Sequence, residues 1–131
     1  MSLRSAAMNS FVGSWRRHSF VLVVQPDGTA TADWRTYRWC GSGSLPPCDA
    51  LVGRRIVPGG HVSLILDTGG TDASAGRVLE STDPAIAPGT PVRLQVPAAG
   101  SLRLALGGAG QEVLWAELCG PHAESMARCG A

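Results

Sequence analysis

The chain has 131 residues, a length typical of one domain with one hydrophobic core. Its 11 basic and 10 acidic residues are scattered along the sequence and give a net charge of +1. Because no basic stripe is present to neutralise phosphates, the composition argues against nucleic acid as a partner.

The chain starts with a short segment, Met1 to Ser10, which we interpret as a tag and a disordered lead-in. It lacks the apolar run of about 7–15 residues that an export signal requires. Nowhere does the sequence contain the run of about 18 apolar residues that spans a bilayer. If the protein is exported, we expect a leader or anchor upstream of this chain.

Alternation of apolar and polar residues predicts two strands, near 14–25 and 29–40. Between them, Pro26-Asp27-Gly28 is a hairpin turn signal. A half-buried antiparallel strand turns every second side chain towards the core. The residues expected on the inward face are Phe20, Leu22, Val24, Ala30, Ala32 and Trp34.

The four cysteines lie at the ends of predicted strands and form two short clips, Cys40 with Cys48 and Cys119 with Cys129. Neither clip has the Cys-x-x-Cys spacing of a metal site, so disulfides are predicted. Of the three possible pairings, the local one requires only that each loop turn back. Disulfides persist in oxidising compartments, so we expect a secreted or surface-anchored protein whose membrane contact is through an upstream anchor.

Later segments repeat the strand pattern, with turn residues between them. The expected strands lie near 51–57, 61–67, 76–81, 91–96, 101–106 and 111–118. Their inward rows are expected to contain Val62, Leu64, Leu66, Val92, Leu94, Val96, Leu102, Leu104 and Leu106.

About eight antiparallel strands, each with one apolar face, can bury that face by closing into a barrel or by stacking as a β-sandwich. Short turns between consecutive strands favour closure. The sequence therefore predicts an all-β domain over residues 11–131, an antiparallel meander closed into a small barrel, with the sandwich as the alternative.

Two sets of motifs resemble known families. Phe11-Val12-Gly13-Ser14-Trp15 resembles the Phe-x-Gly-x-Trp start of lipocalins and other calycins, whose tryptophan plugs one end of the barrel. Calycins also pack a basic residue from near the last strand over this tryptophan, and the nearest candidate here is Arg103.

A second set is similar to small exported or lipid-anchored, lipoprotein-like actinobacterial proteins of uncharacterised function. That set comprises Gly13-Ser14-Trp15-x-x-His18, Asp27-Gly28, Arg35-x-Tyr37-x-x-Cys40, Pro47-Cys48-Asp49 and the segment from Cys119-Gly120-Pro121 to Cys129-Gly130-Ala131.

The resemblance implies a lipocalin-like extracytoplasmic β-domain with Trp15 buried, and it implies no activity. Calycin barrels hold small apolar ligands, whereas Leu, Val and Ala side chains can also fill a barrel of this size. A ligand at the barrel mouth would meet His18, which shares parity with Phe20, and Arg35 and Tyr37 on the paired strand. The alternative for His18 is a hydrogen bond within the core rim, to Asp33 or Tyr37.

Four arginines on the first hairpin could bind an anionic polymer or lipid headgroup through their guanidinium groups. The alternative is a solvated strand face paired with Asp33 and Asp49. The arginines in question are Arg16, Arg17, Arg35 and Arg38.

One motif has an enzymatic interpretation. Asp67-Thr68-Gly69 follows an apolar run and resembles retropepsin-like aspartic proteases, in which two aspartates of a homodimer share a proton and activate water. Residues 70–76 are expected to form a polar loop, and an Asp-Thr-Gly-Gly stretch is also a turn signal. We therefore expect a binding or structural module of the cell envelope without a metal or cofactor, with the protease as the alternative.

Overall fold

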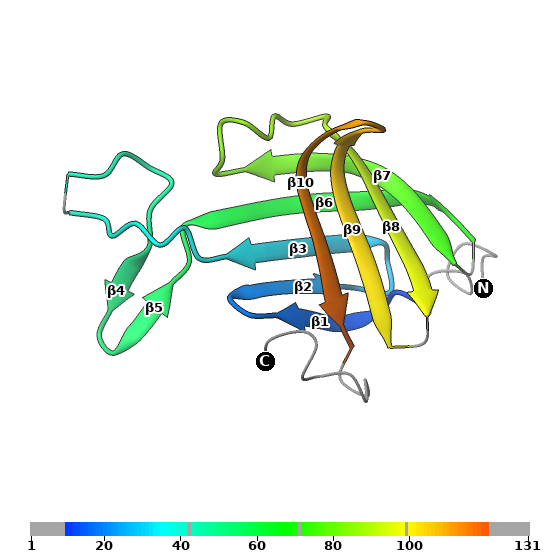
Figure 1. Ribbon diagram of the computed structural model, residues 1–131, viewed down its shortest axis with the longest axis horizontal. Coiled ribbons are helices and arrows are strands. Elements are labelled where there is room, and N and C mark those ends of the chain that lie inside the picture. The colour runs from blue at the N-terminus through cyan, green and yellow to red at the C-terminus, as the bar shows by residue number, and fades with distance from the viewer. Residues whose placement is uncertain (1–9, 42, 71, 99, 121–131) are drawn as a thin grey trace.

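The computed structural model describes residues 10–41, 43–70, 72–98 and 100–120. Within these ranges, eight strands form a closed antiparallel barrel in the order β1-β10-β9-β8-β7-β6-β3-β2, and β4 and β5 form a separate two-stranded sheet (Figure 1). The predicted barrel is confirmed, and the β-sandwich alternative is wrong. The strands are β1 (Gly13–Arg17), β2 (Phe20–Val24), β3 (Thr29–Trp34), β4 (Ala50–Val52), β5 (Arg55–Val57), β6 (Gly60–Gly69), β7 (Ala73–Ser81), β8 (Pro91–Ala98), β9 (Ser101–Gly108) and β10 (Gln111–Cys119).

The turn between β2 and β3 forms where the sequence predicts it. Asp27 Oδ1 accepts a hydrogen bond from the backbone N–H of Thr29 at 2.9 Å. Gly28 has φ 91°, a left-handed conformation that glycine adopts without a steric penalty. Local chemistry of this kind joins consecutive strands without a crossover, so the barrel is a meander interrupted once, by β4 and β5.

The segment predicted as one strand near 14–25 is instead a hairpin. Arg17 pairs with Phe20, so the chain reverses at His18 and Ser19. Ser19 takes a positive φ of 62°. A positive φ at serine is uncommon, and this turn contains no Gly, Pro, Asn or Asp to signal it.

The segment predicted as a barrel strand near 51–57 is also a hairpin, made of β4 and β5 and turning at Gly53. It projects from one end of the barrel (Figure 1). We call residues 35–59, which connect β3 to β6, the arm. Strand β3 ends at Trp34, before the arm and short of the predicted residue 40. The predicted number of barrel strands, about eight, is nevertheless correct. The segment 14–25 contributes two barrel strands instead of one, and the segment 51–57 contributes none.

Aliphatic side chains occupy the barrel interior, in the rows that the alternation predicts. Leu22, Leu64 and Leu104 have no exposed surface. At the arm end, the Phe20 and Trp34 rings stack with centroids 5.6 Å apart. Interiors of this kind pack at the density of organic crystals. The buried inward residues of the predicted rows are Phe20, Leu22, Val24, Ala30, Ala32, Val62, Leu64, Leu66, Val92, Leu94, Leu102, Leu104 and Leu106.

Trp15 is buried, as the resemblance to calycins implies, with 7% of its surface exposed. Its indole Nε1 donates a hydrogen bond to the Phe11 carbonyl at 2.7 Å, and the backbone of Gly120 lies against the ring. Arg103 contacts a different tryptophan: its guanidinium lies 5.8 Å from the Trp115 ring centroid and pairs with Glu117. Arg103, the nearest candidate for the calycin contact with Trp15, therefore contacts Trp115 instead.

Candidate functional site

Exposed apolar side chains gather on the arm. Leu51 and Ile56 lie opposite each other across the β4–β5 hairpin, so they share one face, and Val52 and Val57 lie on the other. A free two-stranded hairpin is marginal in water, and an exposed apolar cluster marks a contact surface. In the described chain, the arm holds seven of the ten exposed large hydrophobic residues: Tyr37, Trp39, Leu45, Leu51, Val52, Ile56 and Val57.

The arm also carries a net positive charge. It contains four arginines and a single acidic residue, Asp49. Arg54 and Arg55 lie at the tip of the hairpin, exposed beside Val52. Apolar and cationic groups are therefore presented together on a hairpin that projects from the end of the barrel (Figure 1).

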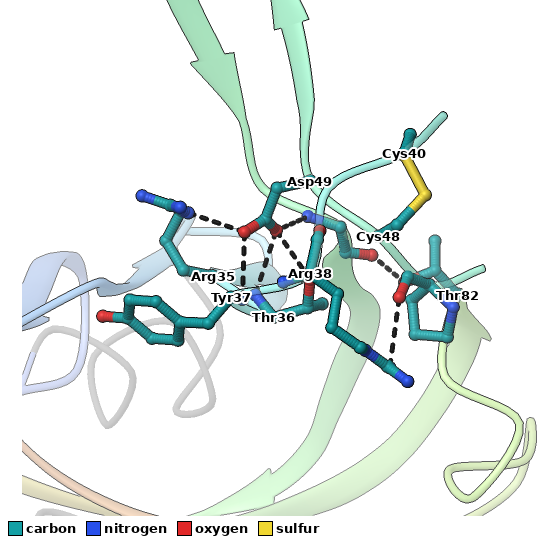
Figure 2. Close-up of a disulfide and its surroundings, with 10 residues drawn as sticks. Arg35, Thr36, Tyr37, Arg38, Cys40, Cys48, Asp49 and Thr82 are labelled. Carbon is teal, nitrogen blue, oxygen red and sulfur yellow. Dashed lines mark hydrogen bonds and ion pairs between the residues drawn. A yellow bond between two sulfur atoms is a disulfide. The ribbon is translucent and has the colours of Figure 1, made fainter. Parts of the chain in front are cut away.

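Asp49 fixes the base of the arm (Figure 2). Its carboxylate is fully buried and accepts hydrogen bonds from Arg35 Nε at 2.7 Å, the Tyr37 N–H at 3.0 Å and the Gly59 N–H at 2.9 Å. Thr36 donates two more, from its N–H and its hydroxyl, both at 2.9 Å. One side chain thus joins the segment that leaves β3 to the segment that enters β6.

These bonds determine the ionisation of Asp49. Burial alone would raise the pKa of this carboxyl group, but the Arg35 guanidinium and the N–H groups of Thr36 and Gly59 favour the charged form by more. The pKa of Asp49 therefore lies far below its ordinary value of 3.8. The carboxylate is ionised at any physiological pH.

A disulfide closes the loop beside Asp49. Cys40 is bonded to Cys48 with a Cα–Cα distance of 5.1 Å, as predicted. Arg38 Nη2 also donates to the Pro47 carbonyl across the loop at 3.1 Å. In the chain-entropy model, a ring this small stabilises the folded state by roughly 2.5–3 kcal/mol. The second expected pair stays a prediction, since Cys129 lies outside the described residues.

The structure brings two of the three predicted site residues together. The Arg35 guanidinium lies 5.1 Å from the Tyr37 ring centroid and 5.2 Å from that of Trp39. The Tyr37 hydroxyl shares a hydrogen bond with the Ser19 hydroxyl. His18, next to Ser19, is exposed in the turn and does not point inward as its parity predicted. Ligand binding by these residues stays a prediction.

The cluster around Arg35 lies outside the barrel interior. The stacked rings of Phe20 and Trp34 fill the barrel at the end from which the arm leaves. Asp33, one partner proposed for His18, instead pairs with His61, at 2.6 Å from Oδ1 to Nδ1. Arg35 does pair with Asp49, as the charge-paired alternative predicted, but Asp49 is buried rather than part of a solvated face.

Asp49 and the apolar hairpin were not predicted as functional features. One signal could have found the hairpin: residues 50–57 place three apolar residues before Gly53-Arg54-Arg55 and two after it, without strand alternation. No local signal identifies Asp49, because its burial depends on Gly59, ten residues away, folding against it.

Asp67 lies in a strand and pairs with arginine. Strand β6 continues through Asp67 to Gly69, and Arg77 Nη1 donates to Asp67 Oδ2 at 2.7 Å. The loop expected over residues 70–76 is wrong, since β7 begins at Ala73 and Gly70 N–H bonds to the Ala73 carbonyl. Asp67 is held in an ion pair with Arg77, whereas an aspartic protease places two aspartates side by side so that they share a proton.

We therefore expect no protease activity. The wild-type protein should cleave no peptide at any pH from about 3 to 8, and Asp67→Asn should change the free energy of unfolding by at most about 1 kcal/mol, as for an exposed ion pair. A fluorogenic peptide assay and urea denaturation measure both. Acid-optimum cleavage that disappears in Asp67→Asn would establish the protease alternative.

Two hollows lie away from the arm. An open pocket of about 340 Å³ lies at the opposite end of β6, and it contains none of the predicted ligand-binding residues. A groove of about 130 Å³ lies on the outer wall, beside the Arg93–Glu112 ion pair and Trp115. The open pocket is lined by Gly69, Gly70, Ala73, Ser74, Ala75, Arg93, Leu94 and Gln95.

Comparisons with known proteins add no assignment: no family model, curated protein or solved structure matches this chain. In the part of the chain that the structure describes, no helix has the length and apolar character needed to cross a membrane. The same residues contain no group of three or more His, Cys, Asp or Glu side chains suited to holding a metal ion. Function is therefore inferred from the arm and the barrel themselves.

Proposed function

We propose that this protein is an extracytoplasmic binding module of the cell envelope, with the barrel as its scaffold and the arm as its binding surface. One observation carries the proposal: the exposed large hydrophobic residues are concentrated on a projecting segment whose base is fixed by Asp49. Leaving apolar surface in water costs free energy, and a rigid base lowers the entropy lost on binding.

The packing of the barrel supports this assignment. The inward side chains are aliphatic and fully buried at Leu22, Leu64 and Leu104, and Phe20 and Trp34 stack at the arm end. A filled interior favours recognition on the outside of the barrel. The Cys40–Cys48 disulfide fits an oxidising compartment such as the cell exterior.

A shortened arm tests the proposal. Replacing residues 51–56 by Asn-Gly joins the opposed residues Ala50 and Val57 by a tight hairpin turn and keeps Asp49 and Gly59 in place. The variant should retain the circular dichroism spectrum and melting temperature of the barrel. Its co-sedimentation with the cell-envelope fraction of the organism that encodes it should fall at least about tenfold, because the exposed aliphatic side chains of Leu51, Val52 and Ile56 are removed.

The matched control is Leu79→Ser/Val113→Ser, which removes exposed apolar side chains from the barrel strands β7 and β10. This control should sediment like the wild type. Full sedimentation of the shortened-arm variant would overturn the proposal.

A second candidate function is the binding of a small apolar ligand at the barrel end away from the arm. The pocket of about 340 Å³ between the β6–β7 hairpin and β8 favours it, since ligand sites start near 300 Å³. Native mass spectrometry of protein purified from its own organism separates the two. If only the mass of the chain is found, binding through the arm is supported. If one small molecule per chain is retained, ligand binding in the pocket is supported.

A further inference from the structure

The β4–β5 hairpin of the arm has the composition of a segment that binds at a membrane interface. Val52 and Arg55 face each other on one side of the hairpin, Leu51 and Ile56 face each other on the other, and Arg54 lies in the turn. Interfacial segments combine apolar side chains that enter the headgroup and acyl boundary with basic side chains that attract anionic lipid. Guanidinium groups match phosphate oxygens in a bidentate geometry.

The distribution of the apolar side chains distinguishes a lipid surface from a protein groove. Leu51 and Ile56 are exposed on one face of the hairpin, and Val52 and Val57 on the other. A protein groove covers one face of such a hairpin, whereas the headgroup region of a bilayer surrounds both. Each strand has only three residues, so its backbone N–H and C=O groups can remain hydrated while the side chains insert.

Charge and aromatic side chains agree with the same partner. The arm has four arginines, and its single acidic side chain is buried and bonded to Arg35. No acidic group is therefore exposed on the described part of the arm to repel anionic lipid. Tyr37 and Trp39 are exposed near its base, and their amphipathic rings are the type enriched at membrane interfaces.

From these observations we infer that the arm binds the surface of an anionic lipid bilayer, an inference that rests on the arm being the binding surface. The side chains of Leu51, Val52, Ile56 and Val57 enter the headgroup and acyl boundary, and Arg54 and Arg55 contact lipid phosphates. Contact of this kind is made by the folded domain itself, in addition to any upstream anchor.

Flotation with defined vesicles tests the inference. The wild-type protein should bind vesicles of phosphatidylcholine with about one third phosphatidylglycerol, and should bind pure phosphatidylcholine more weakly, because anionic lipid attracts each surface arginine. Arg54→Gln/Arg55→Gln should lower the partition coefficient for anionic vesicles by at least about tenfold, since each arginine near the surface contributes about fivefold. Leu51→Ser/Ile56→Ser should lower binding to both kinds of vesicle.

Two controls match these variants in chemistry. Arg77→Gln/Arg103→Gln removes the same charge from the barrel strands β7 and β9, and Leu79→Ser/Val113→Ser removes apolar side chains of similar exposure. Both controls should float like the wild type. An equal loss in the charge control would show that net charge, and not the arm, drives binding, which would overturn the inference.

The remaining outcomes separate this inference from the proposed function. If the wild type sediments with the cell envelope through its arm but binds no anionic vesicle, the lipid inference fails and a protein partner takes its place. If size-exclusion chromatography with light scattering shows a dimer that Leu51→Ser/Ile56→Ser dissociates, and vesicles do not compete, a second copy is the partner. If the shortened arm sediments normally with the envelope, the proposed function fails as well.

Discussion

Replacing Asp49 by alanine should lower the free energy of unfolding by about 3–5 kcal/mol, the usual cost of leaving one member of a buried ion pair alone. The change removes the acceptor for Arg35 Nε and for the N–H groups of Thr36, Tyr37 and Gly59. Equilibrium denaturation measures the loss. Hydrogen exchange should show it first at the base of the arm, because these donors join the two ends of the arm.

The matched control for Asp49 is Asp67→Asn, which breaks an ion pair that is exposed at the barrel wall. An exposed pair contributes about 0–1 kcal/mol, so this variant should stay close to the wild type. Equal, small losses from Asp49→Ala and Asp67→Asn would contradict the role of Asp49 as the fixed base of the arm.

The ionisation of Asp49 also predicts how stability depends on pH. The pKa of Asp49 is lowered in the folded protein, so its contribution is fully present above the unfolded-state value near 3.8. The contribution is lost as the pH falls below that value towards the folded-state pKa. The wild type should therefore lose more stability than Asp49→Asn between about pH 5 and pH 2. Parallel curves for the two proteins would contradict this prediction.

Trp15→Ala should lower the free energy of unfolding by about 3–5 kcal/mol. The indole is 7% exposed, lies against Gly120 beyond the last strand, and donates a hydrogen bond to the Phe11 carbonyl. Alanine would leave a cavity between the first and last parts of the barrel and an acceptor without its donor. Urea denaturation followed by far-ultraviolet circular dichroism measures the change.

Trp115 provides the matched control for Trp15. It has 52% of its surface exposed on β10 and contacts the Arg103 guanidinium, so Trp115→Ala should cost about 1 kcal/mol or less. Comparable losses from the two substitutions would show that Trp15 does not close the barrel.

The core of the fold was predictable because the inward rows follow strict alternation. Leu22, Leu64, Leu94 and Leu104 each lie in a row of apolar residues two apart, and the structure buries all four. Period two is the geometric signature of a half-buried strand, and it does not depend on which strands pair.

Two hairpins were predicted wrongly, each for a physical reason. The chain reverses at His18 and Ser19 without a Gly, Pro, Asn or Asp, so alternation on both sides of the turn looks like one long strand. Residues 50–57 have strand-forming composition, yet β4 and β5 pair only with each other and bury neither face. The β-strand propensity of a segment indicates that it can form a strand, but it does not indicate which sheet that strand joins.

The candidate site was predictable in part. Arg35 and Tyr37 were predicted together on one strand and do lie together, although β3 ends at Trp34 and Asp49 bonds to both residues beyond it. The position of His18 was predicted wrongly because the alternation of Phe20 and Leu22 was extended back to residue 18, across a turn that was not recognised. The burial of Asp49 depends on donors that only the folded arm brings together, so its sequence neighbours give no indication of it.

Hydrogen exchange, followed peptide by peptide in the free protein and in the protein bound to cell envelope, tests most directly whether the arm is the binding surface. Binding to the arm predicts slower exchange confined to peptides from residues 37–57, with the barrel strands unchanged. Slower exchange in the barrel strands around the pocket at Ser74 and Leu94, with the arm unchanged, would contradict it and assign binding to the barrel instead.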